Sequence, residues 1–185
     1  IMLTNGATGN YIGNGGAASG NLVTNCQRGI GIWNDATFGN PIRFNRIWDN
    51  SALGIDLTKN DGSFGVTAND ALDADTGPNN LQNFPTFTSV SLNGSNWQIG
   101  VTLNSAANKA YAIDIYVSPS ADPSNYGEGQ YYLGSVTVTT NGSGVATTTV
   151  SLPHYSGTYG KILTATATDL ATGDTSEFSL RIVGP

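Results

Sequence analysis

Short apolar segments bounded by asparagine or glycine recur at a fixed spacing in the first third of the chain. From Gly29-Ile-Gly-Ile32 to Gly54-Ile-Asp-Leu57 is 25 positions, and an Asn-bounded segment precedes each, Asn21–Asn25 and Asn45–Asn50. Aliphatic side chains at matching positions can stack inside a coil, while Asn and Gly tolerate the left-handed backbone of its corners. The spacing predicts the last turns, or rungs, of a short right-handed parallel β-helix over residues 1–60; the alternative is the loop-rich edge of a sandwich.

From residue 86 onward, apolar and polar positions alternate over longer segments. Tyr111–Val117 and Leu163–Thr168 alternate with period two, which is typical of strands with one buried face. Turn sequences such as Asn93-Gly94 and Asn141-Gly142 separate the segments. The pattern predicts an antiparallel, Ig-like β-sandwich. The expected strands are Thr86–Leu92, Trp97–Leu103, Tyr111–Ser118, Tyr131–Thr139, Val145–Leu152, Ile162–Asp169 and Glu177–Val183.

Composition agrees with an all-β fold class. Only 11% of the residues are charged, and the 24 glycines occur beside many Asn, Ser and Thr residues. These residue types disfavour long helices and favour short strands joined by tight turns. We therefore expect β-helix rungs over residues 1–60, an Asp/Asn-rich joining segment over 61–85 and the sandwich over 86–185.

Charge and hydropathy limit the kinds of partner that the chain can bind. The net charge is −6 and the seven Lys and Arg residues are scattered, so no basic stripe for nucleic acid is present. The sequence contains no run of 18 apolar residues, so it predicts no membrane-spanning helix. Cys26 is the only cysteine, which excludes an internal disulfide framework, and we expect it to be a small core residue. The low charge and the Thr, Ser and Asn content are typical of extracellular or cell-surface proteins.

Four segments carry a family resemblance. Residues Tyr126–Ser135, Thr164–Asp169 and Thr175–Ser179 resemble the C-terminal Ig-like sandwich of bacterial secreted and cell-surface parallel β-helix repeat proteins. Asp73–Pro85 resembles the joining segment of the same proteins. The resemblance covers nearly the whole chain, although the β-helix of such proteins is usually much longer. It implies an architecture and an extracellular location, and it implies no reaction.

The joining segment contains the most suggestive group of carboxylates. Asp70, Asp73 and Asp75 lie within six positions, and Lys59 is the only basic residue near them in the sequence. Calcium takes six to eight oxygen ligands, which a tight Asp-rich loop and its carbonyl groups can supply. The alternative is a metal-free cluster of turn formers. If calcium binds, we expect it to pin the joining segment without a part in catalysis.

The joining segment ends with Leu81-Gln-Asn-Phe84-Pro85, in which Leu81 and Phe84 are large apolar residues. We expect Leu81 and Phe84 to plug the end of the β-helix core. Pro85 is expected to start the first sandwich strand at an edge, where a missing N–H group is tolerated.

Two sequons, at Asn93 and Asn141, could accept N-linked glycans. Both are also hairpin turn sequences, which is the simpler reason for their presence. They are weak candidates for glycosylation.

Catalytic motifs are absent from the sequence, and we expect no enzymatic activity. His154 is the single histidine, and Glu128 and Glu177 are expected at loop or strand-edge positions. The enzymatic alternative is that the chain is part of a polysaccharide lyase or hydrolase. Such an enzyme needs carboxylates beside an Arg or Lys, and the only such group in the sequence is Asp35, Arg43, Arg46 and Asp49. The second alternative is a glycan-binding or adhesin module. Its candidate stacking residues are Trp33, Trp48, Trp97, Tyr126, Tyr131 and Tyr132.

A β-helix of two or three rungs has open ends with unpaired backbone groups, and such edges invite pairing with another chain. The segment Ile1-Met2-Leu3-Thr4 is apolar and uncharged and suits addition to a neighbour's sheet. We expect a structural protein that assembles with copies of itself, head to tail, into a fibre. The alternative is that the chain, including any glycan-binding or adhesin module, was cut from a longer β-helix protein whose upstream rungs cover this end.

Overall fold

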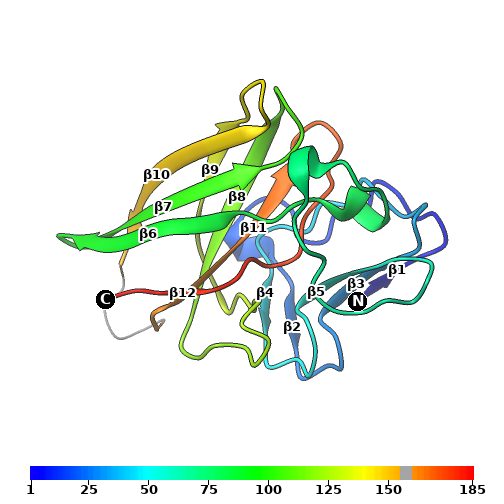
Figure 1. Cartoon of the computed structure of the whole chain (residues 1–185). Helices are drawn as coiled ribbons and strands as arrows, with labels where there is room; N and C mark the ends of the chain where they lie inside the picture. Colours follow the sequence, from blue (N-terminus) through cyan, green and yellow to red (C-terminus); the bar gives the residue numbers. More distant parts are fainter. Residues whose placement is uncertain (155–159) are drawn as a thin grey trace.

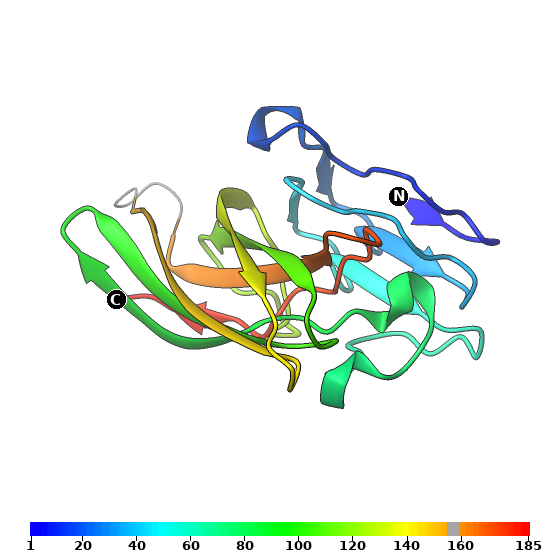
Figure 2. The same ribbon diagram turned by 90° about the horizontal axis from the view of Figure 1, so that it is seen from above.

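The computed structural model describes residues 1–154 and 160–185 of the chain. It is an all-β structure with small parallel sheets at one side and two antiparallel sheets at the other (Figures 1 and 2). In the part of the chain that the structure describes, the helical residues form three short 3-10 turns, η1 (Ala17–Ser19), η2 (Ala71–Asp73) and η3 (Pro78–Leu81). None of these could span a membrane.

The first 58 residues contain five short strands that pair in parallel. Strands β1 (Met2–Leu3), β3 (Ile30–Trp33) and β5 (Ile55–Thr58) form one sheet in the order β1-β3-β5. Strands β2 (Leu22–Thr24) and β4 (Arg46–Trp48) form a second sheet. Ile30 pairs with Ile55 in the register, so the sequence offset of 25 positions is a real spatial register.

Each pass of the chain through β1 and β2, or through β3 and β4, forms one layer of a stack. The aliphatic side chains of the layers lie in one buried cluster, which includes Ile12, Val23, Ile30, Ile32, Ile42, Ile47, Ile55 and Leu57. Glycine lets the layers approach closely: a Cβ atom on Gly29 would lie 2.3 Å from the carbonyl oxygen of Gly54. The small residue at this corner is therefore a steric requirement of the stacking.

The remaining strands form two antiparallel sheets. One has the order β10-β7-β6, with β6 (Thr86–Asn93), β7 (Asn96–Asn104) and β10 (Val145–Pro153). The other has the order β12-β11-β8-β9, with β8 (Ala110–Ser118), β9 (Tyr131–Thr139), β11 (Ile162–Asp169) and β12 (Ile182–Val183). The apolar faces of both sheets share one core, whose largest fully buried members are Trp97, Ile99, Leu103, Tyr111, Ile113 and Ile115.

The expected strand over Glu177–Val183 is largely wrong, because only Ile182–Val183 is a strand. Residues 174–179 instead form an irregular segment beside β11, held by Ser176 N–H to Ala167 O at 2.9 Å and Ser179 N–H to Ala165 O at 2.8 Å. The side chains of this segment are buried. Glu177 and Phe178 turn toward the parallel strands. Ser176 and Ser179 instead accept from Ala167 N–H and Ala165 N–H of β11.

A buried ion pair joins the two parts of the fold. Arg43 donates from Nε and Nη2 to the two carboxylate oxygens of Asp114 on β8, both at 2.7 Å. Asp114 is completely buried, and a forked pair of this kind is geometrically specific. It fixes the second layer of the stack against the sandwich.

Candidate functional site

The first layer of the stack presents an open strand edge. β1 pairs with β3 on one side only, with Met2 opposite Gly31, and Gly31 N–H donates to Ile1 O at 2.9 Å. In a parallel ladder the residue opposite such a donor directs its own N–H and C=O groups away from the partner strand. Met2 therefore turns both groups outward, where no strand of the described chain pairs with them.

The sequence prediction for Ile1–Thr4 was addition to a neighbour's sheet. In the structure this segment is already a strand of its own chain: the terminal amino group donates to Gly29 O at 2.8 Å, and the Thr4 hydroxyl donates to Asn34 Oδ1. The segment can still join a second chain, but only through its outer edge. Around this edge lie exposed apolar side chains of the first layer: Ile1, Met2, Tyr11 and Leu22.

Asparagine side chains connect successive layers at the corners. Asn10 donates from its backbone N–H and from Nδ2 to Asn40 Oδ1, both at 3.0 Å. Asn21 donates to Asn45 Oδ1 in the same two ways, at 3.0 and 2.9 Å. The side chains thus form ladders, in which each corner satisfies a backbone group of its neighbour.

The opposite end of the stack is closed by the sandwich. Asn50, at the corner after β4, donates from its backbone N–H and from Nδ2 to the two carboxylate oxygens of Glu128, at 3.2 and 2.6 Å. Ile47 N–H of β4 donates to Gly129 O at 2.8 Å. Segment 128–129 therefore covers the outer edge of β4.

Side chains from the sandwich and the joining segment close further outer N–H groups. Glu177 accepts from Leu57 N–H of β5 at 2.9 Å and from Thr67 N–H at 2.8 Å. In the layer of β3 and β4, Asn40 N–H donates to Asn79 Oδ1 at 3.1 Å. The other two caps are Gly39 N–H to Asp174 Oδ1 and Ile42 N–H to Thr175 Oγ1.

The two glutamates that close the stack are buried acids. Glu128 and Glu177 are 6% and 2% exposed. Burial raises the pKa of Glu128 to about 7, although its hydrogen bonds from Asn50 act in the opposite direction. Burial raises the pKa of Glu177 to about 8, against the two backbone N–H groups that favour its charged form. Both carboxyl groups therefore change protonation near neutral pH.

Sequence reasoning placed these glutamates at loop or strand-edge positions and gave them no role. Their partners lie 78 and 120 positions away in the chain, so no local pattern could reveal the contacts. The one available signal was their rarity, because only 11% of the residues are charged.

The apolar end of the stack is plugged partly as expected. Leu81 lies in the buried cluster of the layers. Phe84 is buried but packs edge-on against Tyr126, with ring centroids 5.6 Å apart, and is not part of that cluster. Phe178 and Tyr116 of the sandwich complete the plug instead. Pro85 directly precedes β6, an outer strand of its sheet.

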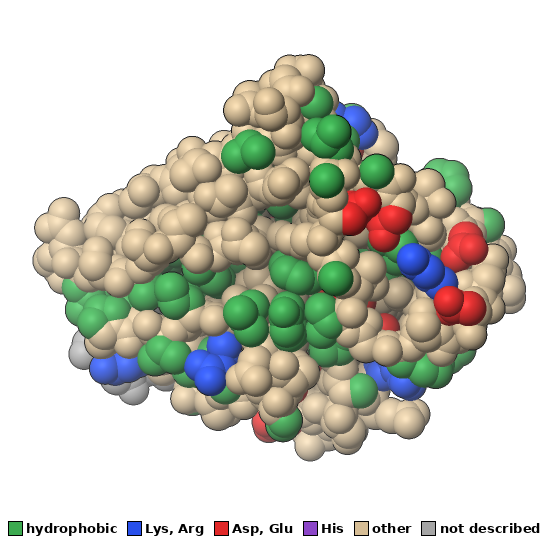
Figure 3. Space-filling view, in the orientation of Figure 1, with side chains coloured by type: hydrophobic (Ala, Val, Ile, Leu, Met, Phe, Trp, Pro, Cys, Tyr) green, Lys and Arg blue, Asp and Glu red, His purple; other side chains and the backbone are tan. Residues whose placement is uncertain are grey.

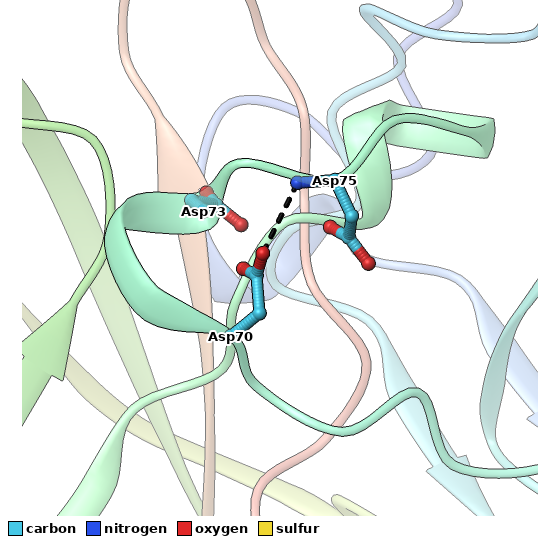
Figure 4. Close-up of side chains that lie close together, drawn as sticks. All are labelled: Asp70, Asp73 and Asp75. Carbon is cyan, nitrogen blue, oxygen red and sulfur yellow. Dashed lines mark hydrogen bonds between the residues drawn. The ribbon is translucent and has the colours of Figure 1, made fainter.

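The three aspartates of the joining segment come together around one loop, as Figure 4 shows. One ligand oxygen of each of Asp70, Asp73 and Asp75 lies within 4.8 Å of the others. Figure 3 shows acidic side chains with a basic one among them on this side of the molecule; Lys59 Nζ lies 3.9 Å from Asp75 Oδ2.

Hydrogen bonds already occupy most oxygens of this cluster. Asp70 accepts from Ala74 N–H and Asp75 N–H, both at 3.1 Å, and Asp73 accepts from Asn83 N–H at 2.9 Å and Ser105 Oγ at 2.6 Å. Asp75 Oδ1 is buried with no hydrogen-bond partner among the described residues. The arrangement is a well-bonded turn, with one oxygen left for a cation.

The repulsion between the carboxylates of the cluster would also favour a bound cation. Burial raises the pKa of Asp73 to about 6, and the charges of Asp70 and Asp75 add to the effect. Burial and the charge of Asp70 raise the pKa of Asp75 as well. A bound cation would relieve this repulsion.

The sequon asparagines lie in exposed hairpin turns. Asn93 ends β6 and Asn141 follows β9, and both are exposed. Asn141 Oδ1 accepts from Ser143 N–H and Val145 N–H at 2.9 and 3.1 Å, so it has a turn-forming role.

The residues considered for catalysis are dispersed. Arg43 pairs with Asp114, and Asp35 bonds Asn60 Nδ2 at 2.8 Å. Over the described part of the chain no ion pair links the two arginines and two aspartates considered for glycan cleavage. Cys26 is exposed, which corrects the expected core position; its N–H joins the ladder of Asn50. The His154 ring packs edge-on against the Trp97 ring, with ring centroids 4.4 Å apart.

Packing accounts for three of the six aromatic residues considered for glycan stacking. Trp97 lies in the sandwich core, Tyr126 contacts Phe84, and Tyr132 contacts Phe44 and Tyr116. Trp48 lines a cleft of about 330 Å³ beside the covered edge of β4. The polar side chains of this cleft are those of Asp49, Asn50, Ser51, Ser118, Ser120, Asp122, Glu128 and Gln130.

No protein-family model matches the sequence. Function is therefore inferred from the two ends of the stack and from the geometry around them.

Proposed function

We propose that the chain is a non-enzymatic extracellular or cell-surface structural module that assembles by β-strand addition at the edge of β1. The observation that carries this proposal is the asymmetry of the stack. Met2 directs its backbone groups outward at one end, whereas Glu128 and Glu177 close the strands at the other. Exposed strand edges are templates for pairing unless they are covered.

The finer architecture belongs to the same proposal. We infer that the parallel layers are the last rungs of a right-handed parallel β-helix and that the antiparallel sheets form an Ig-like sandwich. Support comes from the parallel register between Ile30 and Ile55, from the buried aliphatic stack and from the asparagine ladders at the corners.

Head-to-tail growth into a fibre is the proposed form of assembly. Because the outer edges of β4 and β5 are covered, the tail of such a fibre lies elsewhere on the molecule than the last layer. A contact between two different surfaces does not close on itself, so it propagates.

The test uses a variant that blocks only the outer edge. Met2→Pro removes an outward N–H group while the inner ladder to Gly31 keeps its donors and acceptors. We expect the purified chain to form concentration-dependent assemblies in analytical ultracentrifugation and electron microscopy, and Met2→Pro to reduce them. Met2→Leu is the matched control, because it keeps the N–H group. A chain that stays monomeric at every concentration contradicts the proposal.

Glycan binding is the second candidate function, and the cleft beside Trp48 favours it. An aromatic ring with several polar side chains around a cleft of about 330 Å³ is suited to a saccharide. A glycan array tests it: Trp48→Ala should abolish any signal, and Tyr11→Ala, an exposed aromatic outside the cleft, should leave it unchanged.

A further inference from the structure

The corner asparagines give the stack a direction. In both complete ladders, Asn10 to Asn40 and Asn21 to Asn45, the donors belong to the earlier layer and the acceptor oxygen to the later one. The Oδ1 acceptors of Asn40 and Asn45 therefore face the open end, although the Nδ2 groups of the same residues also donate back to the earlier layer, to Ala7 O and Ile12 O.

At the covered end, side-chain oxygens again accept from the corner donors, although the cap residue Asn79 also donates from Nδ2 to Asn40 O. Asn79 Oδ1 accepts from Asn40 N–H, in the place where a following layer would put its own asparagine. The Glu128 carboxylate does the same for Asn50, accepting both the backbone N–H and Nδ2. The caps thus imitate one further layer.

The open end presents the opposite chemistry. Asn10 and Asn21 are exposed, and among the described residues no group donates to the Oδ1 atom of either one. Whatever covers this end must bring hydrogen-bond donors. Two open ends placed face to face would set acceptors against acceptors, and an acidic cap like Glu128 would do the same.

We propose that the partner of the open end is a polypeptide layer that runs parallel to β1 and β2 and places asparagine side chains over Asn10 and Asn21. The partner would continue the ladders by donating from its backbone N–H and Nδ2 groups, as Asn10 does to Asn40. This inference rests on the strand addition of the proposed function, but it does not require the partner to be a second copy of the chain.

A peptide of residues 28–50 is a suitable probe, because it contains β3, both corner asparagines and β4. We expect it to bind the full chain in biolayer interferometry. The same peptide with Asn40→Asp and Asn45→Asp lacks the side-chain donors and should bind about tenfold more weakly.

Variants of the full chain test the other side of the contact. Asn10→Lys with Asn21→Lys replaces outward acceptors by donors, and peptide binding should fall about tenfold. Asn10→Asp with Asn21→Asp keeps outward acceptors, so binding should persist even where stability falls. The matched control is Asn14→Lys, an exposed asparagine between β1 and β2 outside both ladders.

The outcomes separate the two proposals. Equal binding of both peptides, or no loss with the lysine variants, overturns the inference. If the chain self-assembles and the peptide does not bind, the inference fails while the proposed function stands. Asparagine-dependent peptide binding by a chain that remains monomeric supports the inference and contradicts fibre assembly.

Discussion

Asn50 gives two hydrogen bonds to a single carboxylate, that of Glu128, one from its backbone and one from its side chain. The same asparagine accepts Cys26 N–H of the preceding layer at its Oδ1 atom, at 3.0 Å. Glu128 thus completes a ladder that begins in the parallel layers and ends in the sandwich. The contact makes the sandwich a cap for the stack.

Removing the cap should destabilise the fold. In Glu128→Ala, two buried donors of Asn50 lose their acceptor, and we expect a loss of about 2 kcal/mol in the free energy of unfolding, since an unsatisfied buried polar group costs about 1–3 kcal/mol. Urea unfolding at pH 6 measures it. Asp61→Ala is the control, because Asp61 is exposed and bonds only its own loop. An unchanged midpoint for Glu128→Ala means that the cap does not stabilise the stack.

Local patterns predicted the all-β character and most strand positions, but not the cap. Ile30 and Ile55 carry their register in the sequence because layers repeat at a fixed spacing. The expected strands over Tyr131–Thr139 and Ile162–Asp169 have the same bounds in the structure. The roles of Glu128 and Glu177 depend on segments that meet only after folding, and such distant contacts leave no periodic signal. The strand expected over Glu177–Val183 was largely wrong for the same reason.

Because the layers stack closely, a single methyl group added at Gly29 should strongly reduce the free energy of unfolding. In Gly29→Ala the new Cβ atom would lie 2.3 Å from Gly54 O and 3.0 Å from Ile47 Cγ2, so the layers must separate. Overpacking of this kind costs roughly 1–3 kcal/mol, measured as the free energy of unfolding in urea. Gly142→Ala is the matched control, since nothing lies within 4 Å of its Cβ position. Equal stability of the two variants would show that the layers can shift at little cost.

Calcium binding at Asp70, Asp73 and Asp75 remains a prediction. If the cluster binds the ion, Ca²⁺ should raise the melting temperature of the chelator-treated chain by mass action, and Asp75→Asn should abolish that increase because Asp75 Oδ1 has no other partner. Calorimetric titration gives the affinity. The turn-cluster alternative predicts no response to Ca²⁺ but a loss of stability in Asp73→Ala, whose carboxylate bonds Asn83 and Ser105.

Because these acids are buried, we expect the free energy of unfolding to fall as the pH rises toward 8. The pKa values of Glu177, Glu128 and Asp73 are raised to about 8, 7 and 6 in the fold, above the ordinary values of 4.5 for Glu and 3.8 for Asp. Between the ordinary and raised values the folded chain binds more protons than the unfolded chain, so the free energy of unfolding decreases with pH. The contribution of these groups is complete below about pH 4 and is lost as the pH passes through 6, 7 and 8.

Urea unfolding at intervals from pH 4.5 to 8.5 tests this dependence. Glu177→Gln cannot titrate, so its stability should fall less steeply with pH than that of the unsubstituted chain between about pH 4.5 and about pH 8, the ordinary and raised pKa values of Glu177. Asp61→Asn is the control, because the pKa of Asp61 is lowered by its hydrogen bonds to Ser63 and titration lies below the tested range. Stability that does not change between pH 5 and pH 8 would mean that these carboxyl groups are charged in the folded chain throughout, held so by the N–H groups that they cap.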